Sequence, residues 1–366
     1  MDRISWWRTS FGEAEARRIG HAIAHEHISQ GPVTEEFERQ LAAFLGVPYV
    51  LATTSGSVAE LLALLALGVG PGDEVIVPNR TWIATAHAPM ILGARAVLID
   101  VEPKRPIIDP SQIERAITPR TKAIVPVHLN GRSADMAAIR QVAEKHGLRV
   151  VEDAAQALGS RNSDGLLGTQ SDIGFFSLSV AKIIATGQGG FVATKDARLY
   201  ESLRSVRTHG VSDVIQAQWT RLGFNFRFND ILAAIGLEQL KRLPERIETL
   251  KAVYARYAAA MPEIPFLRWI PVDVASGEIP IYIEVLCRER DRLMAHLEDH
   301  GIQCRPFYPD LDCAGYLQSK GDFPHSRVYG QSGIFLPSGP AQPLENVDRV
   351  IDVLRRFKGK DWLPHE

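Results

Sequence analysis

The chain has 366 residues, which at about 150 residues per domain predicts roughly two domains. Lys and Arg number 41 against 43 Asp and Glu, giving a formal net charge of −2, so overall charge does not favour nucleic acid or an anionic membrane as a partner. The three cysteines are too few for a disulfide framework and form no CxxC pair, so we expect no metal site. With no recognisable secretory signal or membrane span, we expect a cytoplasmic protein.

The first 195 residues alternate strand-like and helix-like segments. The predicted strands are nearly all apolar, as expected of strands covered on both faces, and lie at 49–53, 74–78, 96–101, 123–129, 148–151, 173–178 and 191–194. Helical spacing separates several of them, at 57–67, 84–92 and 135–146. This alternation predicts an open, mostly parallel α/β sheet.

The pattern changes after about Leu243. A long amphipathic helix is predicted first, and further elements follow it: a strand at 280–286 and helices at 290–300 and 347–357. We therefore expect an N-terminal segment and a large domain in residues 1–243, and a small α+β domain formed by residues 244–366.

One predicted strand runs directly into acidic residues. The apolar segment 148–151 is followed by Glu152 and Asp153. Ligands of open α/β sheets bind beyond the carboxyl ends of strands, so a carboxylate there could meet a ligand cation. The alternative is that Asp153 caps the start of a helix.

Lys182 is the only charged residue between Asp172 and Lys195. Burial would lower its pKa and make the amine a nucleophile that can form a Schiff base. The alternative is a lysine that extends to the surface from a loop between two strands.

The segment 53–58 places small and hydroxyl residues between a strand and a helix. Such a turn can bind an anion through the free N–H groups of the helix N-terminus, although it can equally be an ordinary capped helix start. A phosphate cradle, a carboxylate at a strand end and an isolated lysine are together what pyridoxal phosphate needs.

At this point the sequence resembles a known family, the DegT/DnrJ/EryC1/StrS sugar aminotransferases of pyridoxal-phosphate fold type I. The resemblance extends from about Ser29 to about Phe357, in matching order and spacing. The blocks that carry it are ISQGPVTEEFE, SGSVAELLALLALGVGPGDEVIVPNRTWIATA, PVHLNGRSADM, VVEDAAQALGS, FFSLSVAKIIATGQGG and GFNFRFNDILAAIGLEQL. It implies an aspartate-aminotransferase-like α/β fold, with a mixed, mostly parallel seven-stranded sheet and a small α+β C-terminal domain.

The resemblance also implies roles for the residues around the cofactor ring. Lys182 takes the Schiff-base position, and Asp153 pairs with the pyridinium nitrogen as the second catalytic group. Gln156 packs by the ring near its 3-hydroxyl. Trp82 stacks on the ring face, the alternative being a tryptophan of the core.

Four further residues match the family's phosphate contacts. Gly56 and Ser57 match the phosphate-binding turn, and Ser177 a serine that contacts the phosphate. Asn225 matches an asparagine that reaches the phosphate of the neighbouring subunit, which implies a homodimer with shared active sites.

Residues on the substrate side follow from the same blocks: His128, Asn130, His209, Arg305 and Tyr308. For His128, a structural histidine bonded to backbone is an open alternative. The chain departs from the family's usual residues at Gln188, at Asn130 and in the segment 179–181, all near the cofactor or substrate.

The reaction implied is transfer of an amino group from an L-amino acid, expected to be L-glutamate, to a keto-sugar by a ping-pong mechanism. The expected acceptor is a nucleotide-linked 3- or 4-keto-deoxysugar, and Lys182 moves the proton as base and then acid. A keto-cyclitol aminotransferase, a fold type I lyase and a non-catalytic cofactor-bound regulator stay open. A nicotinamide-dependent dehydrogenase is disfavoured because no GxGxxG follows the first strand.

Overall fold

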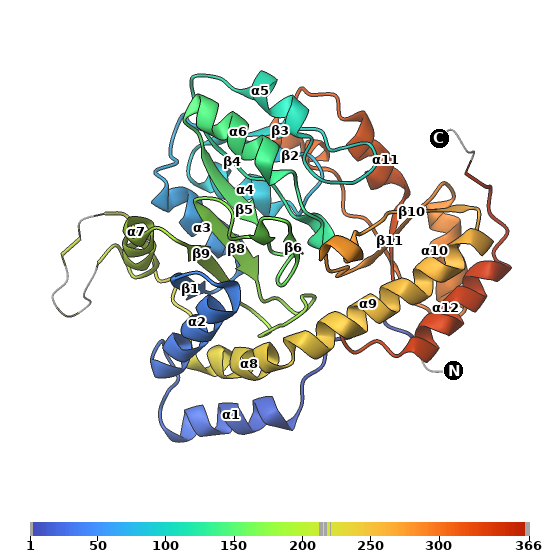
Figure 1. Cartoon of the computed structure of the whole chain (residues 1–366), viewed down its shortest axis with the longest axis horizontal. Helices are drawn as coiled ribbons and strands as arrows, with labels where there is room; N and C mark the ends of the chain where they lie inside the picture. The colour runs from blue at the N-terminus through green and yellow to red at the C-terminus, as the bar shows by residue number, and fades with distance from the viewer. Residues whose placement is uncertain (1–2, 212–214, 216–217, 220, 363–366) are drawn as a thin grey trace.

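A seven-stranded sheet forms the centre of the large part of the computed structural model, which describes residues 3–211, 215, 218–219 and 221–362 (Figure 1). The sheet order is β1-β9-β8-β5-β4-β2-β3. All neighbours pair in parallel except those of β9, which runs antiparallel to β1 and β8. The predicted mixed, mostly parallel seven-stranded sheet is confirmed. The strands are β1 Tyr49–Thr53, β2 Glu74–Pro78, β3 Arg95–Ile99, β4 Thr121–Ile124, β5 Arg149–Asp153, β8 Ile173–Ser177 and β9 Gly190–Thr194.

Helices cover both faces of this sheet (Figure 1). Their ends follow local chemistry: the side chain of Asp135 accepts a hydrogen bond from Ala138 at the start of α6, and Gly147 ends it with φ 65°. No helix among the described residues is both long enough and apolar enough to cross a membrane. The helices of this part are α1 Glu13–Ala24, α2 Pro32–Leu45, α3 Gly56–Ala66, α4 Ala84–Ile91, α5 Ile113–Ala116, α6 Met136–His146, α7 Ala197–Arg207 and α8 Asp230–Lys241, and a small hairpin joins β6 Arg161–Asn162 to β7 Gly165–Leu166.

The C-terminal part contains a second, four-stranded antiparallel sheet of order β10-β11-β13-β12. The sequence predicted only β11 of these strands, because β10 and β12 are three and two residues long and carry no measurable alternation. The strands are β10 Leu267–Trp269, β11 Ile283–Cys287, β12 Arg305–Pro306 and β13 Gly333–Leu336. The helices are α9 Leu243–Ala260, α10 Arg290–Asp299, α11 Pro324–Ser332 and α12 Leu344–Arg356.

The first described residues pack with this C-terminal part. Ile4 forms a parallel bridge with Ile302 and is buried in the same apolar cluster. The start of the N-terminal segment therefore packs against the C-terminal part. The division between residues 243 and 244 stays a prediction.

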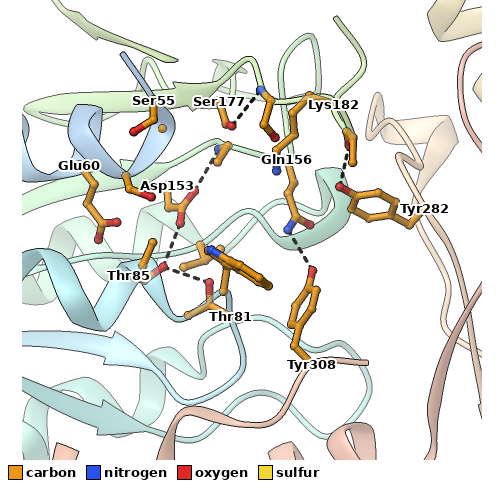
Figure 2. A pocket seen from close by; sticks show the side chains of 18 of the residues that line it. Ser55, Glu60, Thr81, Thr85, Asp153, Gln156, Ser177, Lys182, Tyr282 and Tyr308 are labelled. Atoms are coloured by element: carbon orange, nitrogen blue, oxygen red, sulfur yellow. Dashed lines mark hydrogen bonds between the residues drawn. The ribbon is translucent and has the colours of Figure 1, made fainter. Parts of the chain in front are cut away.

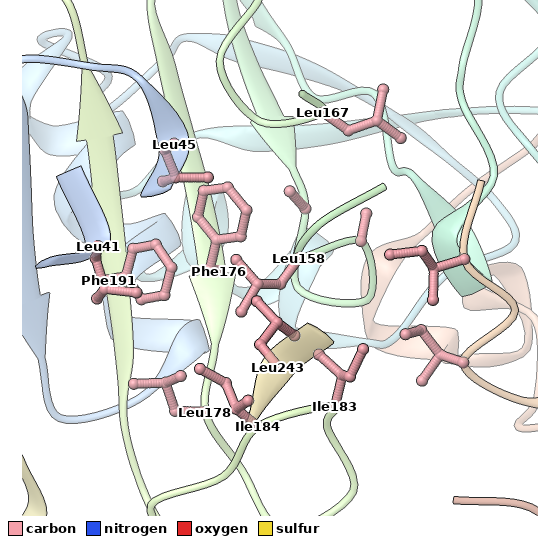
Figure 3. Packing of buried hydrophobic residues seen from close by; sticks show 14 of the residues in the cluster. Leu41, Leu45, Leu158, Leu167, Phe176, Leu178, Ile183, Ile184, Phe191 and Leu243 are labelled. Carbon is pink, nitrogen blue, oxygen red and sulfur yellow. The ribbon is translucent and has the colours of Figure 1, made fainter. Parts of the chain in front are cut away.

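One apolar cluster lies beneath the segment that carries Lys182. Ile183 and Ile184, the next two residues, are buried in it (Figure 3). Phe176 of β8 and Phe191 of β9 stack there with ring centroids 4.5 Å apart. The chain entering and leaving the lysine is thus held by core packing.

Asp230 joins two helices that are distant in sequence. Its buried carboxylate accepts hydrogen bonds from the backbone of Gly31 at 2.9 Å, of Val33 at 3.2 Å and of Thr34 at 2.9 Å, and from the Thr34 hydroxyl at 2.7 Å. It satisfies the free N–H groups at the start of α2 from the first residue of α8.

We expect Asp230→Ala to lower the free energy of unfolding by about 2–4 kcal/mol, because it leaves several buried hydrogen-bond donors without an acceptor. Asp196→Ala removes an exposed cap of α7 and is the matched control, expected to cost about 1 kcal/mol. Denaturant unfolding of both variants measures the difference. Equal losses would contradict the bridging role of Asp230.

Candidate active site

A cavity of about 400 Å³ lies at the carboxyl ends of the parallel strands (Figure 2). Asp153 ends β5 and Ser177 ends β8, and both side chains line it. Arg305 and Tyr308 line it from the C-terminal part. The cavity is therefore where strand ends of the large sheet meet the smaller sheet.

The structure brings most of the predicted site residues together here. Seven of the eight cofactor residues line the cavity: Gly56, Ser57, Trp82, Asp153, Gln156, Ser177 and Lys182. Of the five substrate residues, Arg305 and Tyr308 line it. Asn225, His128, Asn130 and His209 are not among the residues that line it.

Lys182 lies in the segment between β8 and β9, and its amine belongs to the cavity. Two side chains from outside the large sheet hold this segment. The hydroxyl of Tyr282 donates to the carbonyl of Ala181 at 2.8 Å, and the indole N–H of Trp7 donates to the carbonyl of Val180 at 3.1 Å. The lysine does not extend to the outer surface from a free loop.

The charges of Lys182 and Asp153 act on each other within the cavity. Burial lowers the pKa of Lys182 to about 8, and the field of Asp153 opposes this shift. Burial raises the pKa of Asp153, opposed by the N–H of Ala155, the charge of Lys182 and the hydroxyl of Thr85. A substantial fraction of the Lys182 amine is therefore neutral at mildly alkaline pH.

Short contacts orient the Asp153 carboxylate. The backbone N–H of Ala155 donates to Oδ1 at 3.0 Å, and the Thr85 hydroxyl donates to Oδ2 at 3.2 Å. Thr85 is itself 3.1 Å from the hydroxyl of Thr81. Asp153 is the last residue of β5 and caps none of the described helices, and its side chain lines the cavity (Figure 2).

The start of α3 forms the second polar wall. Ser55 caps this helix by accepting a hydrogen bond from the Val58 N–H at 3.1 Å. A side chain at Gly56 would come within 2.8 Å of the Ser177 Cβ atom, so only glycine lets the two segments meet. The turn is both a capped helix start and an opening for an anion on backbone N–H groups.

Gln156 is held between the Asn130 backbone and the Tyr308 side chain, two residues that sequence analysis placed near substrate. Its Oε1 accepts the Asn130 backbone N–H at 2.9 Å, which directs Nε2 to the Tyr308 hydroxyl at 3.3 Å. Tyr308 packs edge-on against Trp82 at 5.2 Å between centroids. Burial raises the pKa of Tyr308 to about 12, so its hydroxyl keeps its proton.

Asn130 supports the site from behind the cavity. The residue is fully buried with φ 55°, and its amide donates to the Tyr282 carbonyl at 2.9 Å and accepts the Tyr282 N–H at 2.5 Å. Asn130 thus joins the two parts of the chain and orients Gln156, a role different from the predicted contact with substrate.

His128 also lies behind the cavity, where it bonds to neighbouring protein groups. It is fully buried, its Nδ1 accepts the Ala134 N–H at 3.2 Å, and its Nε2 therefore carries the proton shared with Glu152 at 3.0 Å. Burial tends to raise the pKa of Glu152, but the hydrogen bonds from His128 and from the N–H of Gly168 hold that pKa below its usual value. These contacts favour the alternative of a structural histidine, and the expected substrate contact stays a prediction.

Asn225 and His209 lie together at the surface, outside the cavity. The Asn225 side chain accepts from Arg227 Nε at 2.9 Å, and its backbone bridges to Thr208. His209 is exposed, and its N–H donates to the Phe224 carbonyl at 2.9 Å. Neither residue lines the cavity that contains Lys182.

Sequence reasoning missed Glu60 and Thr85, which both line the cavity. For Glu60 a signal was present, since it is the only charged residue between Thr54 and Gly72, the kind of isolation that drew attention to Lys182. Thr85 carried no signal, because its role depends on the contact with β5 across the sheet.

The residues present fit pyridoxal phosphate. A phosphate needs donors in a close turn, which the start of α3 and Gly56 provide. A pyridinium nitrogen needs an oriented buried carboxylate, which Asp153 provides, and the cofactor aldehyde needs an amine of lowered pKa, which Lys182 provides.

Comparison with known proteins agrees. The family model of the DegT/DnrJ/EryC1/StrS aminotransferase family matches residues 9–355. The GDP-perosamine synthase of Caulobacter vibrioides is 36% identical, covering 89% of this chain and 90% of that protein. The dTDP-3-amino-3,4,6-trideoxy-alpha-D-glucose transaminase of Streptomyces venezuelae is 36% identical, covering 89% and 87%.

A solved structure extends the likeness to the whole fold. The PLP form of the sugar aminotransferase Spr1654 of Streptococcus pneumoniae superposes with a TM-score of 0.91 at 26% identity, over 96% of this chain and 98% of that one. The predicted resemblance and cofactor are confirmed, and the chain belongs to the DegT/DnrJ/EryC1/StrS family as a pyridoxal-phosphate-dependent aminotransferase.

Proposed function

We propose that this aminotransferase moves an amino group from L-glutamate to the keto group of a nucleotide-linked keto-deoxysugar. The observation that carries the proposal is the cavity, which joins the Lys182 amine and the Asp153 carboxylate to an opening lined by Arg305. The two relatives named above, whose names give GDP- and dTDP-linked amino sugars, support the same substrate class.

The chain's own groups have separate tasks in this reaction. Pyridoxal phosphate supplies an electron-accepting ring. The Lys182 amine, with its pKa of about 8, can hold the cofactor and then carry a proton to and from the reacting carbon. Asp153 holds the ring-nitrogen proton, and Gln156 and Trp82 orient the ring.

Arg305 is the proposed contact for the substrate's anionic group. Among the described residues that line the cavity, the cations are Lys182 and Arg305. The exposed Arg305 guanidinium lies over the Trp6 ring, 4.3 Å from its centroid, and Trp6 stacks on Tyr282. A cation held in this way can pair with a diphosphate or a carboxylate at the opening.

The proposal includes a homodimer in which Asn225 completes the partner's phosphate site. Asn225 is exposed and cannot serve its own cavity. Large apolar side chains are exposed beside it, with Leu222 66% and Phe224 58% accessible, as expected of a surface that another chain covers. A cytoplasmic location is part of the same proposal, supported by three cysteines that are all free thiols.

The direct test converts the enzyme to its pyridoxamine form with L-glutamate and then adds keto-sugars one at a time. We expect a nucleotide-linked keto-deoxysugar to restore the pyridoxal absorption and leave as an amino sugar. A response to keto-cyclitols alone would indicate a keto-cyclitol aminotransferase instead. An eliminated product in place of an amino sugar would indicate a lyase.

Lys182→Ala should abolish the visible absorption of the covalently held cofactor and lower kcat by at least about 10²–10⁴-fold, the range of a proton-transfer group. Spectra and steady-state rates measure both effects. Lys195→Ala, at an exposed position, is the control and should behave as wild type. Turnover by the Lys182 variant close to wild type would show that another amine acts.

Arg305→Gln should raise KM for the nucleotide sugar by about 10–100-fold, since it removes a charged hydrogen bond, while kcat changes little. Arg115→Gln, an exposed arginine of α5, serves as the control. An unchanged KM for both sugar and glutamate would exclude Arg305 from substrate binding.

Asn225→Ala should weaken cofactor retention, measured by the cofactor lost during dialysis. Dimers mixed from Asn225→Ala and Lys182→Ala chains should then recover activity, because one of their two sites receives an intact lysine and an intact asparagine from different chains. If mixing restores no activity although mixed dimers form, Asn225 does not act across subunits.

A further inference from the structure

Glu60 is a buried acid of the cofactor cavity that the reaction above does not use. It lies on α3, one turn after Gly56, and its side chain lines the same cavity as Asp153. Only 1% of the residue is exposed. Figure 2 shows its carboxyl group on the Asp153 side of the cavity, away from Tyr308 and Tyr282.

Among the described residues, no cation forms an ion pair with the Glu60 carboxyl. Its Oε1 atom is sealed from solvent and has no hydrogen-bond partner. Burial raises the pKa of Glu60 well above its usual value, and the charge of Asp153 adds to the shift. An ionised carboxylate there would be an unpaired buried charge, so the neutral acid is the stable form.

Asp153 is placed differently, although it is also buried. It accepts hydrogen bonds from Ala155 and Thr85, and the charge of Lys182 favours its ionised form. Where two acids interact, the pair loses its first proton at the better-solvated or better-partnered group. The single negative charge therefore resides on Asp153 and the proton on Glu60.

We propose that Glu60 is a positioning residue of the cofactor site, the proton-bearing member of a carboxyl pair with Asp153 that presents one negative charge, and one hydrogen-bond donor, at the ring-nitrogen end of the cavity. One charge matches the one positive charge of a pyridinium ring. Because a neutral Glu60 adds no second negative charge, the Asp153 carboxylate would hold the ring proton without an excess of negative charge beside it. The inference rests on the cofactor and not on the identity of the sugar.

The protonation state is tested first on the apo-protein. The pKa of Glu60 is 4.5 in the unfolded chain and higher in the folded chain. The protonated group therefore contributes its full stability below pH 4.5, and this contribution is lost as the pH rises through the folded-state pKa. Glu60→Gln keeps the shape without the titration, so the variant should gain stability relative to wild type between pH 5 and pH 8 (roughly the range over which a raised carboxyl titrates).

Glu144→Gln, at an exposed position of α6, is the control and should show no such gain with pH. Infrared difference spectra should also contain a protonated-carboxyl band in wild type that is missing in Glu60→Gln. A stability difference independent of pH, or the same band in both proteins, would show that Glu60 does not carry the proton.

The role toward the cofactor is tested with three proteins reconstituted with pyridoxal phosphate. Glu60→Gln retains a neutral donor and should bind the cofactor within about threefold of wild type, whereas Glu60→Leu should lose about 3–10-fold, the effect of one neutral hydrogen bond. The pH midpoint of the visible absorption of the bound cofactor should match wild type in the glutamine variant and shift in the leucine variant.

Two results would overturn the role. A loss of more than about tenfold in Glu60→Gln would mean that an ionised Glu60 pairs with the cofactor. An unshifted absorption midpoint in Glu60→Leu would mean that the residue only fills space. Neither result depends on which keto-sugar is the substrate, so a failure here is distinct from a failure of the proposed acceptor.

Discussion

The structure depends on keeping one amine and one carboxylate of opposite charge inside the same cavity. Lys182 and Asp153 both leave water when the chain folds, and each loses hydration that only the other and a few fixed dipoles replace. Burial lowers the pKa of the Lys182 amine more than the charge of Asp153 raises it. The resulting pKa of about 8 is low enough for nucleophilic attack near neutral pH. The amine therefore has its lowered pKa before any substrate binds.

The rest of the fold supports that arrangement from several directions. Tyr282 and Trp7 hold the backbone of the lysine segment from the C-terminal part and from the N-terminal segment, while Ile183 anchors it in the core. Asn130 joins the same C-terminal part to Gln156 beside the ring site. The C-terminal part thus contacts the lysine segment through Tyr282 and lines the same cavity through Arg305.

Periodicity was enough to predict the seven large-sheet strands, because fully covered strands read as apolar runs, and family blocks located Lys182 and Asp153. Short strands such as β10 and β12 have too few residues to show alternation. His128 was placed with the substrate because its strand-end position is shared by true ligand contacts, and only its bond to Glu152 separates the two roles. For Glu60 the sequence shows an isolated acid, but its proposed role depends on Asp153 at the end of β5, which only the structure places beside it.

The acidity of Lys182 is the most direct measure of the central claim. The rate at which the apo-protein captures pyridoxal phosphate should rise with pH with a midpoint of about 8, as the amine loses its proton. Asp153→Asn should move the midpoint lower, because it removes the negative charge that favours the protonated amine. A midpoint at 10.5, the ordinary value for lysine, in both proteins would show that the cavity does not desolvate the amine and would contradict the account.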